Sequence, residues 1–348
     1  MPDTTLKERE ELILQAIVHL YITDAEPVGS RAVVKRFDLD ISPATVRNVM
    51  ADLEEAGFIN QVHTSSGRVP TDKGYRYYVD YLMRVQKVTS TERTRIESDM
   101  TEQLNNADTI LKQTSNLLAM ISHQTGIVEV PNPHVALVNR IELMLMDDRQ
   151  TAMLIADNFG RARTLVLPWT PSDDVDLLIP LNNFLNEQLK GTSIDSLSSS
   201  LRSAIERYTN EQHRLAEQAS QLLNHIPGAA PGKLYLKGAT QLFEQPEFHD
   251  VERAREVFGL LEENDRVVEL MRNGIARNED ASRVTIGSED LEHGLEDVSV
   301  VSAPYKVNDE EVGMIGVLGP RRMPYSRLTG IVEYTADRLG AMLTRISR

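Results

Sequence analysis

Apolar residues recur at helical spacing twice in the first 40 residues. Between residues 6 and 23 they line one face of a helix whose other face is charged. This helix is predicted to end near residues 24–27, because the residue before Pro27 is disfavoured in the α region. A shorter helix is predicted over residues 31–37. The chain therefore begins with two helices joined by a short turn.

A third helix is predicted over residues 44–56, with signals at both of its ends. Ser42 is a suitable N-cap, and Pro43 fits the first helical position, where no backbone donor is needed. Gly57 follows directly after the helix, as expected for a residue that ends it. These signals fix the limits of the third helix within a residue or two.

A β-hairpin is predicted next, from residues 58–63 through a polar tip at 64–67 and back along 68–69. A fourth helix is expected to begin at residues 70–71 and to continue to Leu82. Three helices followed by a hairpin with a glycine in its tip are typical of a winged helix-turn-helix.

The rest of the chain alternates between helical and strand-like patterns. A linker helix is predicted over 90–125 and strands over 134–168, followed by a polar helical stretch over 172–224 and a Pro- and Gly-rich linker at 226–232. Further on, the pattern predicts a helix over 247–271, strands near 282–286, 298–307 and 312–318, and a closing helix over 328–346. This order predicts an α+β domain interrupted by an insertion.

Composition narrows the class of protein. The chain has 348 residues, with 41% hydrophobic and 26% charged, as in ordinary globular proteins, and it has no cysteine, which excludes disulfides and thiol chemistry. No apolar run approaches the roughly 20 residues needed to cross a bilayer. The first residues carry no secretory signal pattern, so we expect a cytoplasmic protein with no membrane partner. The net charge of −15, taken alone, argues against nucleic acid as a partner.

The third helix, in contrast, favours nucleic acid as a partner. At about 100° per residue, Val46, Val49, Met50 and Leu53 share one direction, which we expect to be the buried face. The opposite face carries two alanines, an arginine and an asparagine, with Thr45 on the flank. Small residues permit close approach, and Arg and Asn make bidentate contacts to guanine and adenine. An ordinary solvent-exposed face is the alternative for an isolated helix, but the neighbouring hairpin favours a surface that reads DNA.

The hairpin and the fourth helix add basic groups to this surface. Between residues 58 and 77 there are three basic side chains and one acidic one. A cation and hydroxyls at a glycine-containing tip suit contacts to phosphates or to the minor groove. The residues expected to contact DNA are Arg31, Ser42, Ala44, Thr45, Arg47, Asn48, Thr64, Ser65, Gly67, Arg68, Lys73 and Arg76.

Enzyme chemistry finds little support. The eight histidines show no metal-binding spacing, and the sequence has neither a phosphate-binding loop with its lysine nor a serine nucleophile motif. We therefore expect no catalytic activity, no metal and no cofactor. One basic cluster remains, at residues 319–327. Its three arginines, Arg321, Arg322 and Arg327, could bind an anion at a helix start, or they could pair with acidic neighbours of the same fold.

Several motifs make the chain recognisable. The runs Glu26-Pro-Val-Gly-Ser-Arg31, Leu39-Asp-Ile-Ser-Pro-Ala-Thr-Val-Arg-Asn48 and Ala51-Asp-Leu-Glu-Glu-Ala-Gly57 resemble the DNA-binding domain of the heat-inducible transcription repressor HrcA. His63-Thr-Ser-Ser-Gly-Arg-Val-Pro-Thr-Asp-Lys-Gly-Tyr-Arg-Tyr-Tyr78 resembles the wing and following helix of that family. Gln245-Pro-Glu-Phe248, Val284-Thr-Ile-Gly-Ser-Glu289 and Gly316-Val-Leu-Gly-Pro-Arg-Arg-Met-Pro-Tyr-Ser-Arg327 match as well, so the resemblance spans nearly the whole chain.

The resemblance implies a winged helix over 1–85, a GAF-like domain over 86–171 and 233–348, and an inserted dimerisation domain over 172–232. It also implies a homodimeric repressor of chaperone operons that binds an inverted-repeat operator, is released on heat stress and is assisted by chaperonin. An alternative is a regulator gated by a small molecule, in which the GAF-like domain binds an anionic ligand through the arginine cluster at 319–327.

Overall fold

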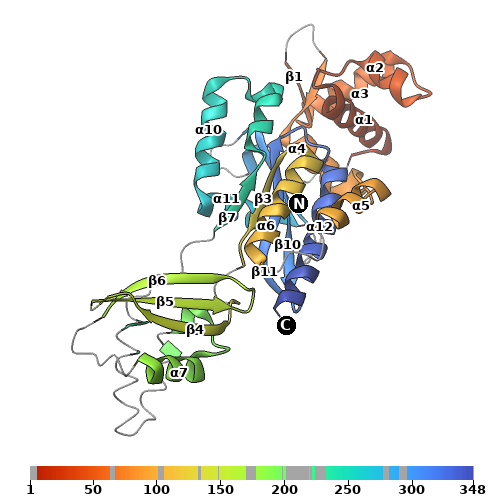
Figure 1. Cartoon of the computed structure of the whole chain (residues 1–348). Coiled ribbons are helices and arrows are strands. Elements are labelled where there is room, and N and C mark those ends of the chain that lie inside the picture. Colours follow the sequence, from red (N-terminus) through yellow and green to blue (C-terminus); the bar gives the residue numbers. More distant parts are fainter. Residues whose placement is uncertain are drawn as a thin grey trace.

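The structure is a computed structural model. It describes residues 6–62, 67–100, 106–131, 135–147, 149–169, 178–197, 199–200, 219, 222–223, 233–276, 282–289 and 296–347. Figure 1 shows three parts: a helical N-terminal part with a small hairpin, a central sheet between helices, and a second sheet with a helix beside it. The N-terminal part and the second sheet lie at opposite ends of the central part, which separates them in every view.

The N-terminal part has the elements that the sequence predicts for a winged helix-turn-helix. Its helices are α1 (Glu8–Asp24), α2 (Ser30–Phe37), α3 (Pro43–Glu55) and α4 (Asp72–Tyr77), and its hairpin pairs β1 (Ile59–Gln61) with β2 (Arg68–Pro70). Gly57 has a left-handed backbone (φ +78°), as its place after α3 requires. The fourth helix begins later than predicted because Thr71 caps it, accepting from the Gly74 amide at 3.1 Å, and it continues as a π-helical turn over 78–82.

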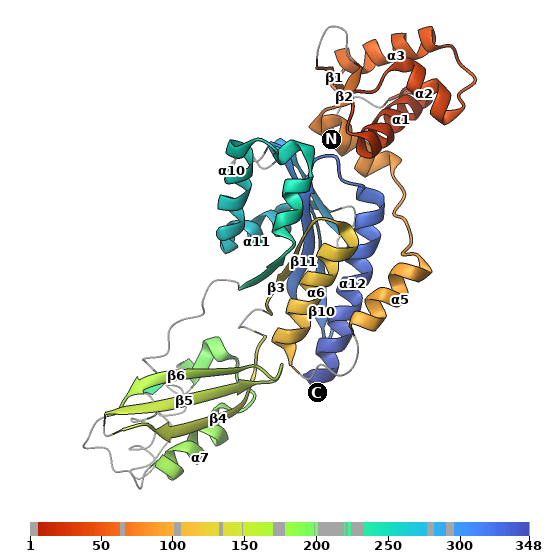
Figure 2. The same ribbon diagram turned by 45° about the horizontal axis from the view of Figure 1, so that its top comes forward.

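The central part is an antiparallel sheet between two helical layers. Its strands are β3 (Thr125–Glu129), β7 (Leu234–Lys237), β8 (Ile275–Ala276), β9 (Arg283–Ile286), β10 (Val298–Val307) and β11 (Glu310–Pro320), in the spatial order β7-β3-β11-β10-β9-β8. One face packs on α6 (Ala107–Ser122) and α12 (Tyr325–Ile346), and the other packs on α10 (Val251–Glu262) and α11 (Asn264–Asn273). Figure 2 shows these helices on the two sides of the sheet. Because both faces are covered, β10 and β11 are buried along nearly their whole length.

The second sheet forms a separate unit with its own core. It contains β4 (Val138–Leu145), β5 (Gln150–Asp157) and β6 (Ala162–Pro168), and α7 (Leu178–Leu189) packs on one face together with Trp169. The chain leaves the central sheet after β3 and returns to pair beside it in β7, with Gly126 opposite Lys237. The insertion therefore starts near residue 130, and the expected boundary at 172 falls inside it. Alternating strands look alike in either sheet, so the sequence pattern could not assign them.

Two long predicted helices are each divided in the structure. The stretch 90–125 forms α5 (Ser90–Asp99) and then α6, which Asn106 caps by accepting from the Asp108 amide at 2.8 Å. The stretch 247–271 forms α10 and α11, separated at Glu263, whose backbone is not helical. The predicted linker 226–232 and most of the predicted helical stretch 172–224 lie outside the described residues. Among the helices that the structure describes, none is long and apolar enough to span a membrane.

Candidate nucleic-acid interface

Helix α3 has the two faces that its sequence predicts. Val46, Val49, Met50 and Leu53 are buried, with exposed fractions of 0, 9, 4 and 1%. Ala44, Arg47, Asn48 and Ala51 are exposed, and Thr45 is half-buried on the flank. The packing of the N-terminal part therefore turns the candidate reading face outward. In Figure 2, α3 lies at the end of the N-terminal part that is farther from the central sheet.

The N-terminal half of α3 is the half suited to DNA. Ser42 caps the helix, because its Oγ accepts from the Thr45 amide at 3.1 Å and lies 2.9 Å from the Thr45 hydroxyl. The helix dipole adds partial positive charge at this end, where Arg47 also lies. The acidic side chains Asp52, Glu54 and Glu55 follow in the C-terminal half. Charge is thus segregated along the helix, and its N-terminal end is the one that favours phosphates.

Arg68 is placed by contacts at the base of the wing. Its Nε and Nη2 lie 3.0 and 2.8 Å from Glu54 Oε2, so the side chain ties the wing to the end of α3. Its backbone exchanges two hydrogen bonds with Val28, at 2.8 and 2.9 Å. Glu54 was not among the sequence candidates, because a carboxylate 14 residues away gives no local signal of the pairing.

The wing also depends on close backbone packing at Gly67. A Cβ at this position would lie 2.5 Å from the Val28 carbonyl group, so only glycine permits the approach. The tip residues Thr64 and Ser65 lie outside the described residues. Arg31 is exposed near the start of α2, beside the candidate reading helix in the same N-terminal part.

The Lys73 side chain is exposed but contacts two neighbouring groups of the N-terminal part. Its Nζ donates to the Ala56 carbonyl at 2.8 Å and lies 4.4 Å from the centre of the Phe58 ring. An ammonium beside the last carbonyls of a helix is favourable, so Lys73 stabilises the end of α3 as well as adding positive charge. It remains close enough to solvent to contact a phosphate.

The structure gives Arg76 a different role from the expected phosphate contact. Its guanidinium donates to Glu289 Oε1 at 2.6 Å and to the Val284 carbonyl at 2.7 Å, both in the central part, and it also pairs with Asp80. Burial opposes its charge, but Glu289 outweighs burial and raises the pKa of Arg76. The two partners in the central part, Glu289 and Val284, are more than 200 residues away in sequence. Arg76 therefore belongs to the contact between the N-terminal and central parts and not to the candidate interface.

The arginines of residues 319–327 are paired within the fold. Arg321 donates to Asp72 and Asp297 at 2.7 and 3.1 Å. Arg322 is bonded to the side chains of Glu247 and Gln245, and Arg327 to the Glu92 carboxylate and the Ile121 carbonyl. Of the two alternatives that the sequence left open, the structure favours pairing with acidic neighbours.

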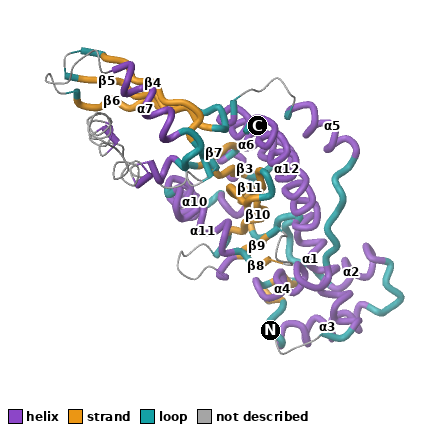
Figure 3. The backbone as a smooth tube through the Cα atoms, turned by 90° about the horizontal axis from the view of Figure 1, so that it is seen from below, coloured by secondary structure: helices purple, strands orange, loops and turns teal. Residues whose placement is uncertain are grey.

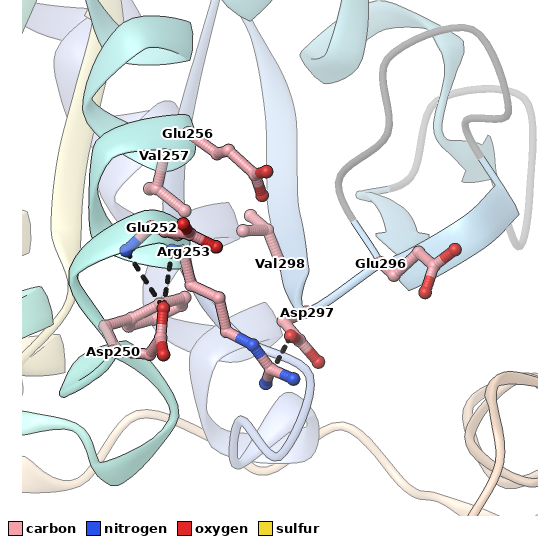
Figure 4. A pocket seen from close by; sticks show the side chains of 9 residues that line it. Asp250, Glu252, Arg253, Glu256, Val257, Glu296, Asp297 and Val298 are labelled. Carbon is pink, nitrogen blue, oxygen red and sulfur yellow. Dashed lines mark hydrogen bonds and ion pairs between the residues drawn. The ribbon is translucent and has the colours of Figure 1, made fainter.

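A cavity of about 520 Å³ lies beside the start of α10 (Figure 4). Five carboxylates and one arginine are among its lining groups: Asp250, Glu252, Glu256, Glu296, Asp297 and Arg253. That lining would repel an anion, and the arginine is already bound to Asp297 at 2.7 Å. The alternative of an anionic ligand held by the arginine cluster therefore gains no support from this cavity. Within the described ranges, no group of three or more His, Asp or Glu side chains could hold a metal ion.

Comparison with known proteins agrees with this arrangement. Residues 5–80 match the family model described as the winged helix-turn-helix transcription repressor, HrcA DNA-binding, and residues 108–329 match that of the HrcA protein C-terminal domain. A heat-inducible transcription repressor HrcA from Geobacter sulfurreducens is 38% identical over 98% of this chain and 99% of its own length. Its counterpart from Pelotomaculum thermopropionicum is 34% identical over 99% and 98%.

A solved structure shares the fold. The crystal structure of a hypothetical protein at 2.2 Å resolution superposes with a TM-score of 0.67 at 22% identity, over 98% of this chain and 100% of that one. This likeness concerns the fold alone, whereas the family models and the near full-length relatives concern the sequence. Together with the outward-facing α3 and its wing, they show that the chain belongs to the HrcA family of heat-inducible transcription repressors.

Proposed function

We propose that this protein is a heat-inducible transcriptional repressor that binds an inverted-repeat operator as a homodimer. The observation that carries the proposal is the exposed face of α3, on which the side chains of Arg47 and Asn48 make no hydrogen bond or ion pair with other described residues. Both side chains are therefore available to base edges in the major groove, with Ala44, Thr45 and Ala51 permitting close approach. The relatives that carry the name of heat-inducible repressors support the same function.

The wing and the basic groups around α3 would position the protein on the DNA backbone. Arg31, Gly67, Arg68 and Lys73 lie on segments that flank α3, and the tip with Thr64 and Ser65 would reach the adjacent groove. Ser42 would contribute by capping α3 as well as by contacting DNA. Because the whole chain is acidic, this surface would bind random DNA weakly and depend on correct base contacts.

The insertion offers a surface for the homodimer. The face of its sheet opposite α7 carries Met144, Ala152 and Val166 side by side across three strands. Met144 and Val166, on the two outer strands of this sheet, are 51 and 56% exposed, so the face presents apolar side chains to solvent. Two copies joined there would present two α3 helices to two half-sites. The GAF-like character of the central part and the assistance by chaperonin remain expectations from the family resemblance, and action in the cytoplasm remains an expectation from the sequence pattern.

Gel-shift titration at two salt concentrations tests the proposal. The probes are an inverted repeat recovered by the wild-type chain from random duplexes, one half of that repeat, and a scrambled duplex. Arg47→Ala and Asn48→Ala should each cost about 1–3 kcal/mol on the repeat and little on the scrambled duplex. Arg95→Ala, which removes an exposed arginine from α5, is the matched control. Equal losses on both duplexes would show that the two residues contact phosphates and do not read bases. Recovery of no repeat would refute sequence-specific binding.

A further inference from the structure

Four segments that are far apart in the sequence meet where the N-terminal part joins the central part. They are α4, the turn η6 (Gly287–Glu289), the start of β10 and the turn that follows β11. Figure 3 shows α4 between α3 on one side and β8 and β9 on the other. The helix therefore connects the candidate DNA-reading surface to the rest of the molecule.

Asp72 and Arg321 form the centre of this junction. Asp72 accepts from Arg321 Nη1 at 2.7 Å and from the amide and hydroxyl of Ser288 at 3.0 and 2.6 Å. Arg321 donates its second amino group to Asp297, which also binds Arg253 of α10 at 2.7 Å (Figure 4). A line of alternating charges thus runs from α4 into the helical layer of the central part.

The segments of the junction also pack closely against one another. A Cβ on Gly287 would lie 2.7 Å from both carboxylate oxygens of Asp72, and the residue has a left-handed backbone (φ +50°). One turn along α4, the Tyr75 ring lies 5.9 Å from that of Tyr325 and is almost fully buried. Arg76 adds its bonds to Glu289 and the Val284 carbonyl on the same side of the helix.

The chain makes a second, covalent connection between the two parts. Residues 83–89 run without regular structure, and the Gln86 amide donates to the Ser326 carbonyl at 2.9 Å. A linker held in this way fixes where the N-terminal part is attached. The N-terminal part could still rotate about this attachment unless a second contact held it. The bonds of α4 to the central part are such a contact. In a homodimer, that rotation determines how far apart, and at what relative angle, the two α3 helices meet DNA.

We propose that Asp72 and Arg321 are positioning residues that determine which half-site spacing the repressor accepts, although neither lies on the DNA-reading surface. The inference rests on the proposed function, since it requires a homodimer on an inverted repeat. Breaking the Asp72–Arg321 pair lets each winged helix rotate. The two helices then engage a repeat of the correct spacing less well, while each one still reads a single half-site.

The test compares Arg321→Gln and Asp72→Asn with the wild-type full chain on four duplexes. These are the repeat recovered by wild type, its single half-site, and repeats with one and two base pairs inserted between the half-sites. Two base pairs turn one half-site by about 70°, at 10–10.5 base pairs per turn. We expect wild type to bind the repeat about 100-fold more tightly than the half-site, and to lose most of this gain on insertion.

Both variants should lose about 10-fold on the original repeat and much of the discrimination between spacings, with unchanged half-site affinity. One variant removes a positive charge and the other a negative charge, so a general charge effect on DNA binding would move them in opposite directions. Glu263→Gln, which weakens the exposed ion pair with Arg266 on α11, is the control and should behave as wild type.

Three outcomes would overturn the inference. Wild-type spacing preference in both variants would show that the pair does not set the orientation. Opposite changes of DNA affinity in the two variants would indicate a general charge effect and no role in orientation. Loss of half-site binding by both would indicate a general folding role. Failure of the proposed function is distinct from all three, because the wild-type chain itself would then recover no repeat or bind it no better than its half.

Discussion

Gly74 offers a sharp test of how α4 is seated against the wing. A Cβ built on this residue would lie 2.1 Å from the backbone oxygen of Phe58, at the start of the hairpin. Side-chain carbons do not approach so closely, so Gly74→Ala must move α4 and the hairpin apart by roughly 1 Å, a strain typical of overpacked cores. The same carbonyl accepts from the Thr71 amide at 3.1 Å, so that bond is weakened as well.

The expected cost follows from these contributions. Overpacking costs about 1–3 kcal/mol, and the weakened hydrogen bond adds about 1 kcal/mol. The higher helix propensity of alanine offsets about 1 kcal/mol. Gly74→Ala should therefore destabilise the N-terminal part by about 1–3 kcal/mol in total. Gly259→Ala in α10 is the matched control, because nothing lies within 4 Å of its added carbon, and it should stabilise its helix by up to about 1 kcal/mol.

Hydrogen exchange measured by mass spectrometry on the full chain resolves the two effects by region. Peptides that cover residues 58–62 and 72–77 should exchange faster in Gly74→Ala, and peptides that cover α10 should exchange more slowly in Gly259→Ala. Wild-type protection of both N-terminal segments in Gly74→Ala would refute the close packing of α4 on the hairpin. A general loss of protection across the chain would show that the effect is not local.

Three further predictions concern the junction, the insertion and the core. Burial opposes ionisation of Asp72, but bonds from Ser288 and Arg321 outweigh it and lower its pKa. Any melting-temperature advantage of wild type over Asp72→Asn should therefore persist at pH 6, begin to fall as pH drops below about 3.9 and vanish only below the lower pKa of the folded state. Val166→Asp should convert dimers to monomers in sedimentation, whereas a dimer that survives would exclude that sheet face. Glu129→Ala should cost about 2 kcal/mol in urea unfolding, because it leaves the buried Met314 amide without its acceptor and removes one of the two carboxylates paired with Arg272; a loss below about 0.5 kcal/mol would contradict this.

Local sequence determined the elements of the N-terminal part and the orientation of α3. Helical periodicity placed Val46 and Leu53 inside and Arg47 and Asn48 outside, and the structure confirms all four. The cap at Ser42 was equally readable, because its partner lies three residues away. Such features depend on neighbours within one or two turns of a helix, and the sequence displays those neighbours directly.

Only the tertiary structure decided which charged groups are free and which strands share a sheet. Arg76 and Arg47 look alike in sequence, yet one is bound to Glu289 and the other faces solvent. The strands over 138–168 carry the same alternation as those of the central sheet but form a separate one. Partners hundreds of residues apart are brought together by the packing of whole elements, and no local pattern records that packing.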